Sequence, residues 1–264
     1  MSNKTPRTNL FDTEERTIFC SKIGREYHLS VWLPQTYYTS DQDYPVIYLL
    51  DGDINFGMAT SFTPLLHWMG GIQEVVVVGI SYAMKSYDQF VKLRELDFKI
   101  PEIIDAPLNS YADLFLNALT QEMIPFIEAN YRTIPSDRCL YGYSSSGFFV
   151  LFALFNQPDA FRCYLSGSGD LDVAYPYLIN HGQMLAERNP DVPIQLYLSV
   201  GGMEENLIPS FHKLISYLEN KKFPGLTLKS EIYKGEQHGS EGVALTYLHG
   251  VRSVYQASNN KDTA

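Results

Sequence analysis

The sequence predicts an α/β fold with a mostly parallel central sheet flanked by helices, and three observations support this. Residues 44–50 and 74–81 are nearly continuous runs of Val, Ile, Leu and Tyr, which is typical of strands buried on both faces. Strand and helix patterns alternate along the whole chain, as a parallel sheet with helical crossovers requires. The 264 residues, 45% of them apolar, suffice for one domain over 1–264, with frayed ends at about 1–10 and 258–264.

The first part of the chain is predicted to contribute four strands and one helix. Alternating apolar and polar residues predict amphipathic strands at 17–23 and 26–33, and Pro34 ends the second. The two buried runs follow. The helix between them covers 54–69 and contains Pro64, which interrupts the helix or marks a late start.

The middle of the chain lacks hydrophobic periodicity between Ser81 and Asn109, and we expect a long functional loop there. Ser110 and Asp113 then have the spacing of a capping box, so a helix is expected to begin at Ser110 and to run to about Tyr131.

The remaining half alternates regularly between strands and helices. Strands are expected at 138–143, 161–169, 193–202 and 226–235. Helices are expected at 146–157, 204–222 and 240–256, and an irregular or helical excursion is expected at 170–190. We see no internal repeat and no linker, which agrees with a single domain.

Composition and charge exclude several classes of function. The formal net charge of -10 argues against nucleic acid and against anionic membrane surfaces as partners. Cys20, Cys139 and Cys163 are widely spaced and form no C-x-x-C pair, which indicates a reduced, cytoplasmic protein. The N-terminus lacks the apolar core of a signal peptide, and no run reaches membrane-spanning length. The oligomeric state is left open.

The segment LYGYSSSGFF at 140–149 has the strand–turn–helix context of a nucleophile elbow, a tight turn that exposes a reactive serine. The backbones of strand and helix approach closely at such a turn, so small residues are needed two positions before and two positions after the serine. Only the frame centred on Ser144 places a glycine, Gly142, two residues ahead. Ser146 then occupies the second small position, and a serine-rich helix start remains the simpler alternative.

A serine nucleophile requires a base and an acid that orients the base. Among six histidines, His238 lies in a polar, glycine-containing loop after the last apolar strand, where an α/β-hydrolase presents its base. Glu204 and Glu205 follow an earlier strand, and Glu204 is the preferred acid. Asp170 and Asp172 are weaker candidates. The order serine, acid, histidine is that of the α/β-hydrolase fold.

The oxyanion of such a reaction needs two backbone N–H donors. Ser145 follows the nucleophile and supplies one, and the loop after residues 44–50 supplies the other, most simply through Asp53. Asp51 and Asp53 also resemble the D-x-D loop of aspartyl-phosphate phosphatases. Asn55 stands where such a loop has threonine or valine, and no paired-aspartate magnesium motif follows, so a phosphatase or a plain turn stays the alternative.

Six stretches recur in an order that is known from one family. They are YPVIYLLDGDINF, VVVVGISY, RELDF, EMIPFIEANYRTIPSDRCLYGYSSSG, SVGGMEE and YKGEQHGS. From about Thr17 to Tyr255 the chain resembles the putative esterase family of α/β-hydrolases, which includes siderophore esterases that open enterobactin-type trilactones. The resemblance implies an α/β-hydrolase fold and assigns roles to matching positions: Ser144, His238 and Glu204 in catalysis, Asp53 and Ser145 as oxyanion donors.

Two departures from the family pattern matter. Ser146 stands where the family usually has glycine, and SGSGD at 166–170 stands where many members have Ser-Pro-Ser. The second departure alters the loop beside the nucleophile, so it bears on substrate preference. Arg94 and Asp97 of the RELDF stretch are expected to form an ion pair near the cleft or to serve the structure only.

The expected function is hydrolysis of carboxylic esters, of siderophore type or other small aromatic esters, through an acyl-enzyme without metal or cofactor. The expected substrate contacts are Phe56, Tyr82, Arg94 and Tyr175. A ferric tris-catecholate is strongly anionic and disfavoured by the net charge, unless Lys85, Lys92 and Arg94 form a basic patch. A catalytically degenerate binding protein and a thioesterase or acyltransferase stay open as alternatives.

Overall fold

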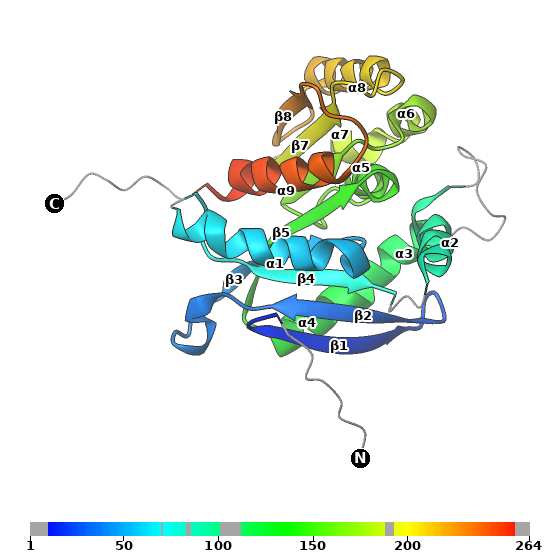
Figure 1. Ribbon diagram of the computed structural model, residues 1–264. Coiled ribbons are helices and arrows are strands. Elements are labelled where there is room, and N and C mark those ends of the chain that lie inside the picture. Colours follow the sequence, from blue (N-terminus) through cyan, green and yellow to red (C-terminus); the bar gives the residue numbers. More distant parts are fainter. Residues whose placement is uncertain (1–9, 70, 83–85, 101–111, 188–192, 257–264) are drawn as a thin grey trace.

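One eight-stranded sheet runs through the computed structural model, which describes residues 10–69, 71–82, 86–100, 112–187 and 193–256 (Figure 1). The strand order is β1-β2-β4-β3-β5-β6-β7-β8. The strands are β1 Thr13–Cys20, β2 Arg25–Trp32, β3 Tyr44–Leu49, β4 Val76–Ser81, β5 Thr133–Tyr143, β6 Cys163–Gly167, β7 Ile194–Gly201 and β8 Leu226–Tyr233. β2 pairs antiparallel with β1 and with β4, and the other pairs are parallel. The predicted mostly parallel sheet is confirmed.

The strands β3 and β4 are buried at every position because both faces of the sheet are covered. On β4, Val76 and Val78 belong to one buried cluster, whereas Val77 belongs to the other. On β3, Tyr48 and Leu49 divide in the same way. This period of two explains why the sequence showed continuous rather than alternating hydrophobicity here.

Helices form a layer on each face of the sheet. α1 (Gly52–Trp68) and α9 (Ser240–Tyr255) lie next to each other on one face (Figure 1). The other face carries α5 (Ser145–Asn156), whose ten consecutive residues from Ser146 to Phe155 are all buried. The remaining helices are α2 Tyr87–Phe98, α3 Ala112–Ala118, α4 Ile124–Asn130, α6 Leu171–Asn180, α7 Gln183–Glu187 and α8 Ile208–Lys221, with a 3₁₀ turn η1 at Gln35–Tyr38.

The predicted loop between Ser81 and Asn109 is wrong over 87–98, where α2 forms. Ser86 caps this helix by accepting a hydrogen bond from the Gln89 N–H at 3.2 Å. The helix escaped prediction because it buries only Phe90, Asp97 and Phe98 and carries charged residues between them. The excursion at 170–190 is helical in α6 and α7.

The predicted helix 110–131 is interrupted rather than continuous. Ser110 lies outside the described residues, and α3 passes through a π-helical turn, η2 (Leu119–Met123), into α4. Pro125 lies at the start of α4, where it cannot donate a hydrogen bond to the carbonyl four residues earlier.

The carboxyl ends of β3, β5 and β7 lie at one edge of the parallel sheet, where α/β proteins form their sites. Asp51, Ser144 and Glu204 follow these three strands, and His238 follows β8. The topology therefore gathers residues that are far apart in the sequence. In the described part of the chain, no helix is long and apolar enough to cross a bilayer.

Candidate active site

Ser144 lies between the last residue of β5 and the first residue of α5 with φ 63° and ψ -127°. A non-glycine residue in this region of φ/ψ space is strained, and such strain persists only where the surrounding structure enforces it. The Ser144 N–H donates to the Gly167 carbonyl at 2.8 Å, which fixes the turn to β6. The serine that the Gly142 frame selected therefore lies on a strained strand-to-helix turn, which is the backbone geometry that a nucleophile elbow requires.

Close packing explains the glycines on both sides of this turn. A Cβ at Gly142 would lie 2.3 Å from the Ser146 carbonyl oxygen, and a Cβ at Gly147 would lie 2.4 Å from the Gly167 carbonyl oxygen. Neither contact is possible for a real side chain, and backbone atoms cannot give way easily. Gly142 and Gly147 are thus required by the approach of α5 to β5 and β6.

Ser146, at the position where glycine was expected, is fully buried and hydrogen-bonded. Its hydroxyl oxygen accepts from the Tyr143 N–H at 3.0 Å and lies 2.7 Å from Asp51 Oδ2, to which its hydrogen is donated. The Tyr143 carbonyl, at 2.9 Å, is a second possible acceptor for the same hydrogen. The carboxylate is the stronger acceptor, so Ser146 connects the elbow to the loop after β3.

Asp51 is 2% exposed and occupies the left-handed region, with φ 54°, at the start of α1. Arg94 of α2 donates to both of its oxygens, through Nε to Oδ1 at 2.9 Å and Nη2 to Oδ2 at 2.7 Å. The expected pair between Arg94 and Asp97 is wrong. Asp97 is fully buried and instead binds Arg25 at 3.0 Å and the Tyr27 hydroxyl at 2.7 Å, both on β2.

His238 and Glu204 form the second half of the site. His238 Nδ1 lies 2.6 Å from Glu204 Oε1. The other oxygen, Oε2, accepts from the Ser168 hydroxyl at 2.6 Å and from the Gly201 N–H at 2.7 Å. Because Nδ1 donates to the carboxylate, Nε2 of the neutral ring keeps a lone pair and can accept a proton. Glu205, the alternative acid, is exposed.

Backbone hydrogen bonds hold the loop that carries Glu204 against the loop that carries His238. The Gly202 N–H donates to the Tyr233 carbonyl at 2.8 Å, and the Met203 N–H donates to the Glu236 carbonyl at 2.9 Å. The aromatic ring of Tyr143 lies 5.2 Å from the imidazole of His238, measured between ring centroids. These contacts restrict the orientation of the imidazole.

The two partners shift each other's pKa in opposite directions. The hydrogen bond to Glu204 raises the pKa of His238 above its ordinary value, although burial of the ring opposes this. Burial raises the pKa of Glu204, but hydrogen bonds from His238, Ser168 and Gly201 outweigh it and lower that pKa below its ordinary value. Glu204 is therefore ionised over the neutral range.

Two hollows meet at Ser144 and His238. The larger, of about 650 Å³, also has Asp51 and Arg94 in its walls, with apolar surface from Ile54, Met58, Phe62, Tyr87 and Phe90. The smaller, of about 430 Å³, is acidic and includes Asp170, Asp172 and Glu204. Burial raises the pKa of Asp170. In the described ranges, no three or more His, Cys, Asp or Glu side chains are grouped so as to hold a metal ion.

Of the four expected substrate contacts, only Arg94 lines the larger hollow. Phe56 packs beneath α1 against Gly79 of β4, and Tyr82 is buried between the rings of Tyr27 and Phe90. Tyr175 lies on α6 beside α8 and lines a different depression. Sequence reasoning placed these aromatics near the cleft by their position after strands, which does not say to which side a ring points.

The two expected oxyanion donors both lie at the start of a helix. Ser145 is the first residue of α5, and Asp53 is the second residue of α1. The Asp53 carboxylate accepts from the Tyr82 N–H at 2.7 Å and so ties the start of α1 to the end of β4. Amides at helix N-termini favour negative charge.

Ser168 is a site residue that the sequence analysis did not assign. It is buried, has φ 42°, and belongs to the SGSGD stretch that departs from the family pattern. Its position directly after β6, at the carboxyl ends of the parallel strands, was the available signal. The sequence did not indicate that the Ser168 hydroxyl would bind Glu204.

Comparison with known proteins places these features in a family. A model of the family described as putative esterase matches residues 20–208. Ferri-bacillibactin esterase BesA of Bacillus subtilis is 30% identical over 210 residues, which cover 74% of this chain and 71% of that protein. The siderophore triacetylfusarinine C esterase of Aspergillus fumigatus is 30% identical over 129 residues, covering 47% of this chain and 43% of that protein.

Solved structures share the fold along nearly the whole chain. The BES protein from Bacillus cereus matches with a TM-score of 0.84 and 22% identity, covering 97% of this chain and 100% of that chain. The enterobactin and salmochelin hydrolase IroE matches with a TM-score of 0.71 and 20% identity, covering 92% and 96%. The predicted α/β-hydrolase-type fold is confirmed by these likenesses and by the sheet topology.

The link between Ser146 and Asp51 leads to a prediction about stability. Replacing Ser146 by alanine leaves the buried Asp51 carboxylate with one donor fewer, and we expect the free energy of unfolding to fall by ~1.5–3 kcal/mol. Urea denaturation measures this value.

The matched control is Ser61→Ala. Ser61 is exposed on α1, and its hydroxyl donates only to the Gly57 carbonyl of its own helix, so we expect a change within about 0.5 kcal/mol. Equal stability of the two variants would contradict the role assigned to Ser146.

Proposed function

The chain belongs to the putative esterase family, and we propose that it is a serine hydrolase that cleaves carboxylic esters through an acyl-enzyme on Ser144. The observation that carries this proposal is the strained Ser144 between β5 and α5, in hollows shared with a His238 whose Nδ1 is bound to Glu204. A nucleophile, a base and an orienting acid are thus supplied by three loops at one edge of the sheet.

In the proposed reaction, His238 Nε2 takes the proton of the Ser144 hydroxyl while Oγ attacks the ester carbonyl. The negative charge that develops on the carbonyl oxygen is stabilised by the backbone N–H groups of Ser145 and Asp53. His238 then gives its proton to the leaving alcohol, and an acyl group remains on Ser144. A water molecule, deprotonated by His238, attacks this acyl-enzyme, and the acid leaves as His238 returns the proton to Ser144 Oγ.

Glu204 acts in this scheme through His238 rather than on the substrate. Its charge stabilises the imidazolium that forms when His238 takes the proton, and its position fixes the tautomer. Ser168 and the Gly201 N–H hold the second carboxylate oxygen, so Glu204 cannot rotate away from the ring. Support for this role comes from the three short contacts that Glu204 makes.

The charges around the cleft support an uncharged substrate. Arg94 contributes a positive charge to the larger hollow, but the buried carboxylate of Asp51 offsets it. The smaller hollow is acidic, and the protein carries a net charge of -10. Lys85 lies outside the described residues, and the described lining of the two hollows holds no lysine. A multiply anionic ester would therefore be repelled.

One relative is named a ferri-bacillibactin esterase and another a siderophore esterase, and we infer a bulky ester of siderophore type as the substrate class. Within that class, the charge balance favours a ferric tris-hydroxamate ester, which is neutral, over a trianionic ferric tris-catecholate. The apolar wall of Phe62, Tyr87 and Phe90 suits the organic shell of such a complex.

Replacing Glu204 by glutamine tests the proposed mechanism. His238 must be neutral to act as base, so kcat/KM for a p-nitrophenyl ester is expected to rise with pH through the His238 pKa. Because Glu204 raises that pKa above its ordinary value of 6.5, the wild-type midpoint should lie above 6.5. In Glu204→Gln the midpoint should move to lower pH, and kcat should fall by about 10³–10⁴-fold.

Glu205→Gln is the matched control, because this neighbouring carboxylate is exposed and should leave the rate and the midpoint unchanged. A wild-type protein that hydrolyses no ester would contradict the function. An unchanged pH profile in Glu204→Gln would contradict the role of the acid.

A pair of siderophore esters tests the inferred charge preference. At low ionic strength, kcat/KM for a neutral ferric tris-hydroxamate ester is expected to exceed that for a trianionic ferric tris-catecholate trilactone by about tenfold or more. Added salt should raise the value for the trianion by screening repulsion and leave the neutral ester nearly unaffected. Faster cleavage of the trianion, slowed by salt, would show an attractive field and overturn the inference.

A further inference from the structure

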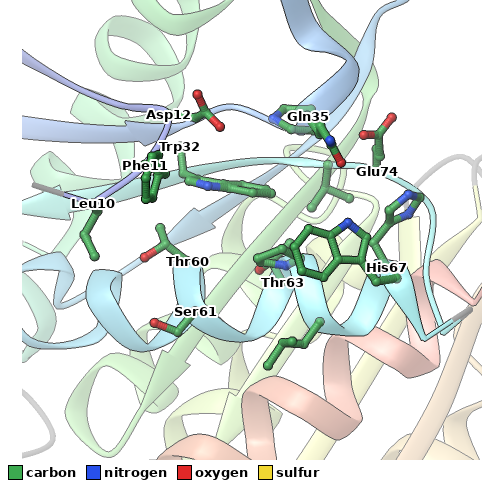
Figure 2. A pocket seen from close by; sticks show the side chains of 15 residues that line it. Leu10, Phe11, Asp12, Trp32, Gln35, Thr60, Ser61, Thr63, His67 and Glu74 are labelled. Atoms are coloured by element: carbon green, nitrogen blue, oxygen red, sulfur yellow. The ribbon is translucent and has the colours of Figure 1, made fainter.

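A second cleft, of about 490 Å³, lies between α1 and the β1–β2 hairpin and shares no lining residue with the hollows at Ser144 (Figure 2). Its lining residues are Leu10, Phe11, Asp12, Trp32, Pro34, Gln35, Thr60, Ser61, Thr63, Pro64, Leu65, His67, Trp68, Glu74 and Val75. We call it the tryptophan cleft. Its volume is within the range of small-molecule sites.

Both tryptophans of the sequence line this cleft. Trp32, at the end of β2, is 9% exposed, and Trp68, at the end of α1, is 67% exposed. Figure 2 shows the Trp32 ring between Asp12 and Gln35 on one side and the hydroxyl-bearing face of α1 on the other. Phe11 adds a third aromatic ring, 89% exposed. An aromatic-walled cleft can bind apolar bodies and, through the faces of its rings, cations.

The hydroxyl groups on the α1 side offer no hydrogen to a ligand. The hydroxyls of Thr60, Ser61 and Thr63 donate to carbonyls of their own helix at 3.0, 2.8 and 2.7 Å. His67 Nδ1 lies 3.1 Å from the Ile72 carbonyl, which can only accept, so this nitrogen carries a hydrogen. Nε2 of the neutral ring is then an acceptor. The Thr63 oxygen is also engaged by the Tyr247 hydroxyl at 2.6 Å, so the acceptors of this wall are the hydroxyl oxygens of Thr60 and Ser61 and His67 Nε2.

The charged groups of the tryptophan cleft are both negative. Glu74 is bound by uncharged donors, the Thr36 N–H at 3.2 Å and the Thr36 hydroxyl, and Asp12 is exposed at the opening. The fifteen lining residues include no lysine or arginine. Across the described ranges of the chain, neither carboxylate takes part in an ion pair. Within the described residues, the negative charge of the cleft is therefore not paired with a cationic side chain.

We propose that the tryptophan cleft binds a small organic ammonium ion with an apolar body. The aromatic rings contact the apolar part and stabilise the cation, and Asp12 and Glu74 supply opposite charge at its rim. This cationic ligand differs in charge from the carboxylate that ester hydrolysis releases. Its site is also separate from the proposed catalytic hollows. Binding here does not depend on whether Ser144 is catalytic.

Intrinsic fluorescence tests this directly, because every tryptophan of the protein lines the cleft. The full chain is titrated, at constant ionic strength, with benzyltrimethylammonium, with benzyl alcohol and with phenylacetate. We expect a saturable change in tryptophan emission with the cation and no saturable change with the neutral or the anionic probe. Saturation by all three probes, or by none, would overturn the proposal.

Asp12→Asn tests the contribution of charge. Asp12 has φ 54°, a conformation that asparagine also tolerates, so the variant removes the charge without new backbone strain. We expect the Kd for benzyltrimethylammonium to rise about fivefold. Asp43→Asn removes an exposed carboxylate that does not line the cleft and should leave Kd unchanged. An equal effect of both variants would show only the general field of an acidic protein and would contradict the site.

Discussion

The hydrogen bonds to the buried carboxylate of Asp51 are the interactions on which the candidate site depends most. It accepts two hydrogen bonds from Arg94 of α2 and one from Ser146 of α5, and its own backbone starts α1. Asp51 thereby holds together α1, α2 and α5, which are far apart in the sequence. A buried carboxylate without donors would be costly, so each partner is needed by the others.

Glu204 has a comparable role in the smaller hollow, which Ser144 also lines. It also uses both oxygens, one for His238 and one shared by Ser168 and Gly201. Its neighbouring backbone is bound to the histidine loop, so acid and base are held as a unit. Ser144 is held in a strained conformation and lines both hollows, one with Asp51 and the other with Glu204. An arrangement of this kind fixes the orientation of the polar groups before a substrate binds.

Most of the sheet could be predicted because buried parallel strands have an unmistakable composition. The strands β3 and β4 are buried at every position and are apolar except at Gly79 and Ser81, and β3 is followed by a segment with Asp51 and Gly52. The order of Ser144, Glu204 and His238 could be predicted for a related reason. Each follows a predicted strand, and parallel strands present their carboxyl ends on the same side. These are local properties of the chain.

The pairing of side chains could not be predicted, since it depends on the rotation and packing of helices. Arg94 and Asp97 are three residues apart on α2 and looked like natural partners. The helix instead presents Arg94 to Asp51 and buries Asp97 against β2. Ser146 was read only as a small residue, and its bond to Asp51 requires the approach of two loops. The tryptophan cleft combines residues from 10 to 75 and has no sequence signature.

Fluorophosphonate labelling of the purified protein, followed by mass spectrometry of its peptides, tests the central claim most directly. The reagent forms a covalent bond with an activated serine and leaves ordinary hydroxyls unmodified. We expect one adduct, on Ser144, absent from Ser144→Ala and retained in Ser145→Ala. Failure of the well-folded wild type to label, or an adduct on Ser145 or Ser146 in place of Ser144, would contradict the account.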